Sequence, residues 1–176
     1  ARWGHPAAIN ALIAAQRANV NLQNDHGHTA LHEAAFWGQP EAINALIAAQ
    51  GADVNLQNND GNTALHVAAR WDQPTAIDAL IAVQGINVNL KNDDGDTALH
   101  VAAIGGQPAA ITALIRERRE ALLYAKNNDG RNALQLALRG YNEQNRTAAV
   151  AALLAGEALL TITITSQQLF TVIQMV

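Results

Sequence analysis

Histidine and carboxylate side chains are the first candidates for chemistry in this sequence. The stretch HGHTALH places His26, His28 and His32 close together, which is compatible with a metal site. His32 also opens HEAA, but this stretch lacks the second histidine of the HExxH zinc-protease motif. Residues 92–96, NDDGD, resemble the start of a calcium loop, but no glutamate follows at the twelfth position. We therefore interpret NDDGD as a solvated acidic turn and not as a metal site.

Other signatures of catalysis are absent from the sequence. It contains no GxSxG nucleophile motif and no glycine-rich phosphate loop, so we expect neither enzymatic activity nor a cofactor or metal. The formal net charge of −4 argues against a protein built to neutralise phosphates. The chain has no cysteine, which fits a reducing compartment. We expect a cytoplasmic protein without a membrane span; a nuclear protein or an effector secreted into a host cytosol is an alternative.

An internal repeat organises the chain. The segments HGHTALHEAA, DGNTALHVAA and DGDTALHVAA start at His26, Asp60 and Asp94, a step of 34 residues, and a weaker copy, DGRNALQLAL, starts at Asp129. The four prolines follow the same step, at Pro6, Pro40, Pro74 and Pro108. Proline is favoured at the first position of a helix, where its missing N–H would be unpaired anyway. Each proline therefore marks the expected start of a helix.

Each unit is predicted to consist of a turn, a short helix, a tight turn and a longer helix. In the unit that begins at Asp60-Gly61, the glycine supplies the turn and Thr63 caps the first helix. The second helix is expected to run from Pro74 to about Gln84 and to stop at Gly85. Neither helix is long enough to be stable alone, so the units must stack and bury their apolar faces on one another.

The repeated segments NNDGNTALHVAA and NDDGDTALHVAA resemble the ankyrin-repeat signature D-x-x-G-x-T-P-L-H-x-A-A, and residues 51–55, GADVN, match its end. The resemblance spans roughly residues 1–156. Alanine replaces the proline of the signature, and the period is one residue longer than the usual 33. The resemblance implies an all-α fold, an ankyrin-type α-solenoid of stacked helix–turn–helix repeats with short β-turn fingers.

The repeat also predicts how the chain is divided. We expect a partial repeat that holds only a second helix over residues 1–24, repeats over 25–58, 59–92 and 93–127, a degenerate capping repeat over 128–156, and a C-terminal segment over 157–176. This last segment either caps the array or starts a further domain. Because the chain begins in the middle of a repeat, we expect a piece of a longer or processed protein. Arg119 replaces the glycine that stops the second helix, so this helix is expected to continue through IRERREALLY, residues 115–124.

The resemblance implies a structural role for His32, His66 and His100. They occupy the TALH position, where the imidazole binds the backbone of a neighbouring loop in ankyrin repeats. Packed helices lie about 8–10 Å apart, whereas zinc–nitrogen bonds are about 2 Å long. This histidine row therefore cannot share one ion, and we expect His26 and His28 to be surface residues of a turn.

The tryptophans form a column of the repeat, and a second column of large residues adjoins it. The tryptophan column consists of Trp3, Trp37 and Trp71, continued by Gly105 and Gly140, and the adjacent column consists of Arg2, Phe36, Arg70, Ile104 and Arg139. In ankyrin repeats, these positions are variable and face solvent on the concave side. One interpretation is that each indole packs on the next repeat without a further role. We favour a ladder of exposed indoles about 10 Å apart, interleaved with guanidinium groups, because aromatic residues and arginine dominate interface hot spots.

The turn tips form a further candidate surface. They carry Asp25, His26 and His28, then Asn59, Asp60 and Asn62, then Asp93, Asp94 and Asp96, and finally Asp129 and Arg131. This column becomes more acidic toward the third turn. Turn tips are often merely solvated. If they contact the same partner as the indoles, that partner offers basic groups as well as apolar or cationic ones.

These patterns predict a protein–protein interaction module whose partner carries a basic or apolar segment. Its anchors would be Trp3, Trp37, Trp71 and Phe36, beside Ile104; Arg2, Arg70 and Arg139 would bind acceptors, and Asp93, Asp94 and Asp96 would attract the basic segment. One alternative is a nucleotide or single-stranded nucleic-acid binder that stacks bases on the indoles, although the acidic net charge disfavours it. The other is a spacer or regulatory array attached to a catalytic domain outside this sequence.

Overall fold

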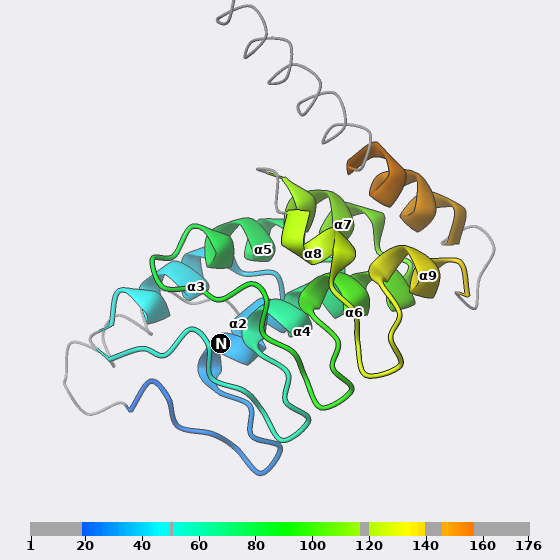
Figure 1. Cartoon of the computed structure of the whole chain (residues 1–176). Coiled ribbons are helices and arrows are strands. Elements are labelled where there is room, and N and C mark those ends of the chain that lie inside the picture. The colour runs from blue at the N-terminus through cyan, green and yellow to red at the C-terminus, as the bar shows by residue number, and fades with distance from the viewer. Residues whose placement is uncertain (1–18, 50, 117–119, 140–145, 157–176) are drawn as a thin grey trace, which may run out of the picture.

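The computed structural model describes residues 19–49, 51–116, 120–139 and 146–156. Its helices form two stacked layers (Figure 1). The first layer consists of α2 (Ala30–Phe36), α4 (Ala64–Arg70), α6 (Ala98–Gly105) and α9 (Ala133–Ala137). The second contains α3 (Pro40–Ile47), α5 (Pro74–Ile81) and α7 (Pro108–Ile115), with α8 (Glu120–Tyr124) packed against α7 and α9. Residues 146–156 are also helical. The predicted helix–turn–helix solenoid is confirmed.

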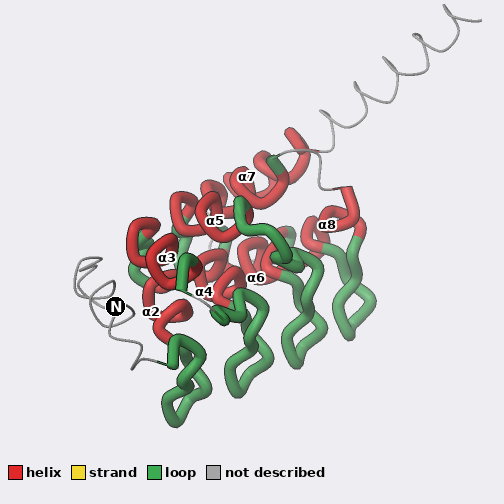
Figure 2. The backbone as a smooth tube through the Cα atoms, turned by 90° about the vertical axis from the view of Figure 1, so that its left-hand side faces the viewer, coloured by secondary structure: helices red, strands yellow, loops and turns green. Residues whose placement is uncertain are grey.

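Finger loops precede the helices of the first layer and lie side by side along one edge of the stack (Figure 2). Each first helix begins where the histidine at its third position and the threonine before the helix form a capping box. In the second finger, the backbone N–H of Thr63 donates to His66 Nδ1 at 3.2 Å. Asn132 and Gln135 form the same arrangement at the start of α9. The prediction that Thr63 caps a helix is confirmed.

The second helices begin at the repeated prolines, as expected, but they end early. Helix α5 ends at Ile81 instead of about Gln84. The backbone then tightens into successive turns, in which Val83 N donates to Leu80 O at 3.2 Å and Ile86 N donates to Val83 O at 3.3 Å. Gly85 accommodates the reversal with a φ of 90°.

The prediction of one continuous helix through residues 115–124 is wrong. Helix α7 ends at Ile115, Arg116 adopts an extended conformation with ψ at 147°, and α8 is a separate helix. The physical reason lies in Leu122 and Leu123, which are both buried in the core. A straight continuation of α7 would advance about 1.5 Å per residue. It would have carried these leucines beyond the end of α7 and away from the core.

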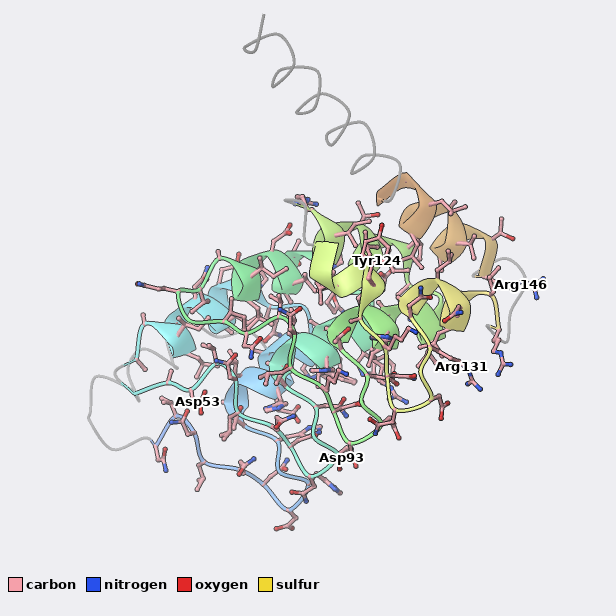
Figure 3. The ribbon with its side chains drawn as sticks, viewed as in Figure 1. Asp53, Asp93, Tyr124, Arg131 and Arg146 are labelled. Atoms are coloured by element: carbon pink, nitrogen blue, oxygen red, sulfur yellow. The ribbon has the colours of Figure 1, made fainter. Side chains whose placement is uncertain are left out.

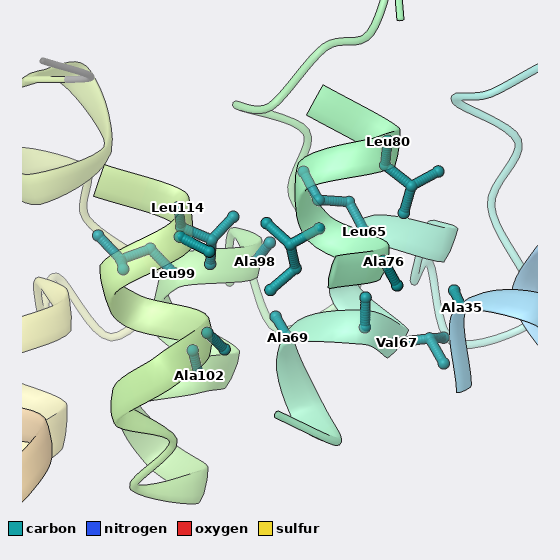
Figure 4. Close-up of a cluster of buried hydrophobic side chains, with 14 of the residues drawn as sticks. Ala35, Leu65, Val67, Ala69, Ala76, Leu80, Ala98, Leu99, Ala102 and Leu114 are labelled. Carbon is teal, nitrogen blue, oxygen red and sulfur yellow. The ribbon is translucent and has the colours of Figure 1, made fainter. Parts of the chain in front are cut away.

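The core follows the repeat and is built from alternating small and large apolar columns (Figure 4). Fully buried alanines such as Ala35 and Ala69 allow neighbouring helices to approach closely. Leucine and isoleucine side chains such as Leu65, Leu99 and Ile77 fill the space between the two layers. Because this core is supplied without the aromatic residues, the positions of Trp37 and Trp71 at the helix ends need a separate explanation.

None of the helices in the described ranges has the length and apolarity needed to cross a membrane.

Candidate partner-binding surface

Each finger is held in shape by an asparagine at its base. In the second finger, Asn58 Oδ1 accepts hydrogen bonds from the backbone N–H groups of Asp60 at 3.0 Å and Asn62 at 2.8 Å. The same pair of bonds recurs at Asn24, Asn92 and Asn127. These side chains satisfy the donors of the turn, so the tip has a defined conformation without contacts from a partner.

Adjacent fingers are also tied to one another. Asn59 N donates to His26 O, and Asp93 N donates to Asp60 O, both at 3.2 Å. Gln57 Nε2 donates to Lys91 O at 2.9 Å. The fingertips therefore form a preorganised row, and a partner that binds to them does not have to order the loops first.

The buried histidines connect each first helix to the following finger. Their Nδ1 atoms accept from the threonine N–H, so Nε2 carries the proton in the neutral ring. Nε2 of His32, His66 and His100 then donates to a carbonyl oxygen of the next finger, at 2.9, 3.0 and 3.0 Å. The acceptors are Asn62, Asp96 and Arg131. The role in loop binding that the resemblance implied for these histidines is confirmed.

Burial sets the protonation state of this histidine row. Desolvation lowers the pKa of His32, His66 and His100, and for His66 it lowers the pKa to about 4. The hydrogen bond to the next finger acts in the opposite direction but is the smaller effect. The rings are therefore neutral at pH 7, and both nitrogens of each are occupied.

The two histidines at the first fingertip do not assemble a metal site. His28 stacks on His32 with ring centroids 5.4 Å apart, and its Nδ1 lies 3.4 Å from Glu33 Oε1. The His26 ring meets His28 edge-on at 6.4 Å. Across the residues that the structure describes, no three histidine or carboxylate side chains converge as metal ligands.

Large apolar side chains are exposed at the ends of α2, α4 and α6. Trp37 is 42% exposed, Trp71 51% and Ile104 39%. Arg70 and Arg139 are also exposed. The predicted anchors Trp3 and Arg2 lie outside the described residues. We call these exposed helix ends, together with the fingertips, the inner surface.

Phe36 differs from the prediction of a solvent-facing residue. It is half-buried and packs against the core. Its ring meets both indoles edge-on, with centroids 4.9 Å from Trp37 and 4.7 Å from Trp71. The indoles are thus not separate rungs of a ladder, because Phe36 joins them across the boundary between two repeats.

A hollow of about 510 Å³ lies between the third and fourth fingers. It adjoins both the column of turn tips and the column that contains Ile104 and Arg139. Asp93, Asp94, Asp129 and Arg131 line it from the fingers, and Ile104, Leu136 and Arg139 line it from the helices. Figure 3 shows Asp93 and Arg131 on neighbouring fingers. An ion pair of 3.0 Å links Arg131 to Asp129. Acidic turn tips and the helix-end residues Ile104 and Arg139 thus line the same hollow.

The prediction that residues 92–96 form a solvated acidic turn is wrong for Asp96, which is buried. It lines the hollow but is only 5% exposed, because its Oδ1 accepts a hydrogen bond of 2.8 Å from Asn127 Nδ2 of the next finger. Burial raises the pKa of its carboxyl group. Asp93 and Asp94 are exposed, as expected.

Sequence reasoning missed the residues that fix the turns behind the inner surface. Asp72 adopts a φ of 51°, and its Oδ1 accepts from Ala110 N at 2.7 Å, at the start of α7. Gln107 Nε2 donates to Arg70 O at 3.1 Å. The one available signal was that Asp72 stands where the neighbouring repeats have Gly38 and Gly106.

Comparison with known proteins agrees with this architecture. A family model of ankyrin repeats, in three copies, matches residues 1–92 and 73–164. A search of curated proteins found no match. Ankyrin repeats are generally protein–protein interaction modules, and the family is typically non-catalytic. The chain belongs to the ankyrin-repeat family.

Proposed function

We propose that the inner surface binds a segment of another protein, with Trp37 and Trp71 as its apolar anchors. The observation that carries this proposal is the exposure of both indoles and of Ile104 at equivalent helix ends. Contiguous exposed apolar surface usually marks a partner site. The core is already filled by aliphatic side chains, so these residues are not needed to complete it.

The arrangement around the indoles suits recognition. Phe36 contacts both rings, and rigid aromatic side chains lose little conformational entropy when a partner covers them. Arg70 and Arg139 offer planar donors to carboxylates or carbonyl groups. The fixed fingertips add Asp93 and Asp94, which attract a basic segment.

A protein partner is favoured over a nucleic acid. The third and fourth fingertips carry Asp93, Asp94 and Asp129, which would face the phosphates of a bound strand. Nucleic-acid affinity depends strongly on the neutralisation of phosphates by basic side chains. The sequence without cysteine also fits binding in a reducing compartment such as the cytoplasm.

The proposal is tested by partner recovery from a cytosolic extract. Wild type is compared with the Trp37→Ala/Trp71→Ala double variant, and circular dichroism first checks that both are folded. Tyr124→Ala is the matched control, because Tyr124 is a 60% exposed aromatic residue on α8, away from the fingers (Figure 3). We expect the double variant to lose partners that wild type and Tyr124→Ala retain. Equal recovery by all three proteins would contradict the proposal.

A further inference from the structure

Asp96 carries a buried charge that the fold does not require. Its Oδ1 accepts from Asn127 Nδ2 at 2.8 Å. The preceding finger has Asn62 at the equivalent position, and Asn62 Oδ1 accepts from Asn92 Nδ2 at 3.0 Å. The contact between fingers thus needs one acceptor oxygen, which a neutral amide supplies equally well.

The carboxylate form of Asp96 is costly where it stands. Burial is the main cause that raises its pKa, and the nearby carboxylates of Asp94 and Asp129 act in the same direction. The bond from Asn127 and the proximity of His100 oppose them. In the described part of the chain, no donor forms a hydrogen bond with Asp96 Oδ2. This oxygen is not fully enclosed, because Asp96 lines the hollow, so a cationic group in the hollow can reach it.

The hollow beside Asp96 has two chemically different walls. Its finger wall carries the carboxylates of Asp93, Asp94, Asp96 and Asp129, and its helix wall carries Ile104 and Leu136. The guanidinium groups of Arg131 and Arg139 also line it, so that four carboxylates and two guanidiniums leave a net charge of −2 when Asp96 is ionised. Arg131 is already paired with Asp129 at 3.0 Å.

Lysine and arginine side chains match these two walls, because each combines an aliphatic stem with a cationic head. We infer that the hollow is a subsite for an arginine or lysine side chain of the bound segment, with its cationic group at Asp96 and its stem against Ile104 and Leu136. The inference rests on the proposed function, since the side chain belongs to the segment that the inner surface binds. In this subsite the charge of Asp96 binds a cationic group, a role that the neutral Asn62 of the preceding finger does not have.

The chain itself supplies the test variant. Asp96→Asn reproduces the residue of the second finger and keeps the acceptor for Asn127, so its free energy of unfolding at pH 7 should equal or exceed that of wild type. Asp53→Asn is the matched control, because it removes an exposed carboxylate that lies outside the fingertips and the hollow and keeps the acceptor for Asn55 N. A clear loss of stability in Asp96→Asn would contradict the view that the fold does not need this charge.

The binding experiment uses a displayed library of random peptides, selected on the wild-type chain. We expect the selected peptides to share a basic residue next to an aliphatic one. Close charge pairs at interfaces are coupled strongly enough that Asp96→Asn should weaken peptide affinity by about tenfold or more. Asp53→Asn should change it by less than about threefold, as is usual for an exposed charge. Replacement of the basic peptide residue by a neutral isostere, citrulline for arginine, should weaken binding to wild type but not weaken binding to Asp96→Asn further.

The outcomes separate this inference from the proposed function when Trp71→Ala is tested on the same peptides. Peptides that require Trp71 but bind Asp96→Asn as well as wild type would overturn the subsite and leave the proposed function standing. Peptides that require Asp96 but not Trp71 would support the subsite and count against the aromatic anchors. A selection that yields no peptide dependent on either residue would overturn both.

Discussion

Two rows of residues follow the same repeat in this molecule but differ in what their side chains contact. The Thr–His row is buried and identical in three repeats, and the Nε2 atoms of its histidines donate to the backbone of the following finger. It consists of Thr29-His32, Thr63-His66 and Thr97-His100. The row that contains Trp37 and Trp71 is half exposed and changes to Gly105 in the next repeat. The contrast separates a row that holds the fingers together from a row that is available to a partner.

The pH dependence of stability should report on the buried row with the largest effect. Because the pKa of each buried histidine is lowered, the unfolded chain binds more protons than the folded one in mild acid. The stabilisation is complete above about pH 6.5, the ordinary histidine value, and for His66 it is lost as the pH falls to about 4. A shift of this size corresponds to about 3 kcal/mol at His66 alone. Urea unfolding between about pH 7 and about pH 4 measures the loss.

His66→Gln is the control for this pH dependence. Gln135 occupies the equivalent position in the fourth repeat and forms a capping box with Asn132, so glutamine is compatible with the fold but does not titrate. Asp96 acts in the opposite direction to the histidines, because burial raises its pKa. The comparison between wild type and variant removes that contribution. An equally steep pH dependence in both proteins would show that His66 does not carry the effect.

Truncation of a buried histidine should have the next largest effect. His66→Ala leaves a cavity and removes the bonds to Thr63 and to Asp96 O, so we expect a loss of about 2–4 kcal/mol in the free energy of unfolding. The exposed His26 is the matched position, and His26→Ala should change stability by less than about 0.5 kcal/mol. Denaturant titration distinguishes the two. A loss below about 1 kcal/mol in His66→Ala would mean that the row is not structural.

Substitution of Asp72 should have a smaller effect on the free energy of unfolding. Its side chain stabilises the start of α7, but its left-handed backbone conformation is unfavourable for a residue other than glycine. Asp72→Ala removes the cap on Ala110 N and leaves a residue with a side chain at a φ of 51°, so we expect a loss of about 1–2 kcal/mol. Asp72→Gly also removes the cap but relieves the backbone, as Gly38 and Gly106 do in their repeats. Thermal unfolding should therefore rank wild type above Asp72→Gly and Asp72→Gly above Asp72→Ala. The reverse order of the two variants would contradict this account of the turn.

The exposed row should contribute least to stability. Trp71→Ala is expected to lower the free energy of unfolding by about 1 kcal/mol, because half of the indole is exposed and its main ring contact is Phe36. Leu65→Ala provides the buried comparison, with an expected loss of about 2–5 kcal/mol. Denaturant melts of both variants measure the difference. If Trp71→Ala cost about 3–5 kcal/mol, the indole would belong to the core and not to a binding surface.

The parts of the fold that were predictable are those with a local cause. The repeated prolines mark helix starts because proline suits the first helical position, and Thr63 marks a cap because its side chain reaches the first turn. The break after α7 has no such cause. Arg119 suggested a longer helix, but the burial of Leu122 and Leu123 against other elements determined where the chain turns.

The candidate site was predictable in outline but not in detail. The columns of Trp37, Trp71, Ile104 and the fingertips follow from the repeat. The contact of Phe36 with both indoles depends on side-chain directions, which spacing does not give. Asp94 and Asp96 look alike in the sequence, yet only Asp96 is buried, because Asn127 of another finger reaches it.

The central claim is that the exposed row, and not the buried one, carries recognition. The most direct measurement is the affinity of the recovered partner for wild type and for the folded Trp37→Ala/Trp71→Ala variant. Interface hot spots each contribute at least about 2 kcal/mol, so we expect affinity to fall by about thirtyfold or more, while the variant stays folded with a melting temperature only several degrees lower. An unchanged affinity would contradict the claim and would move the binding site away from the indoles.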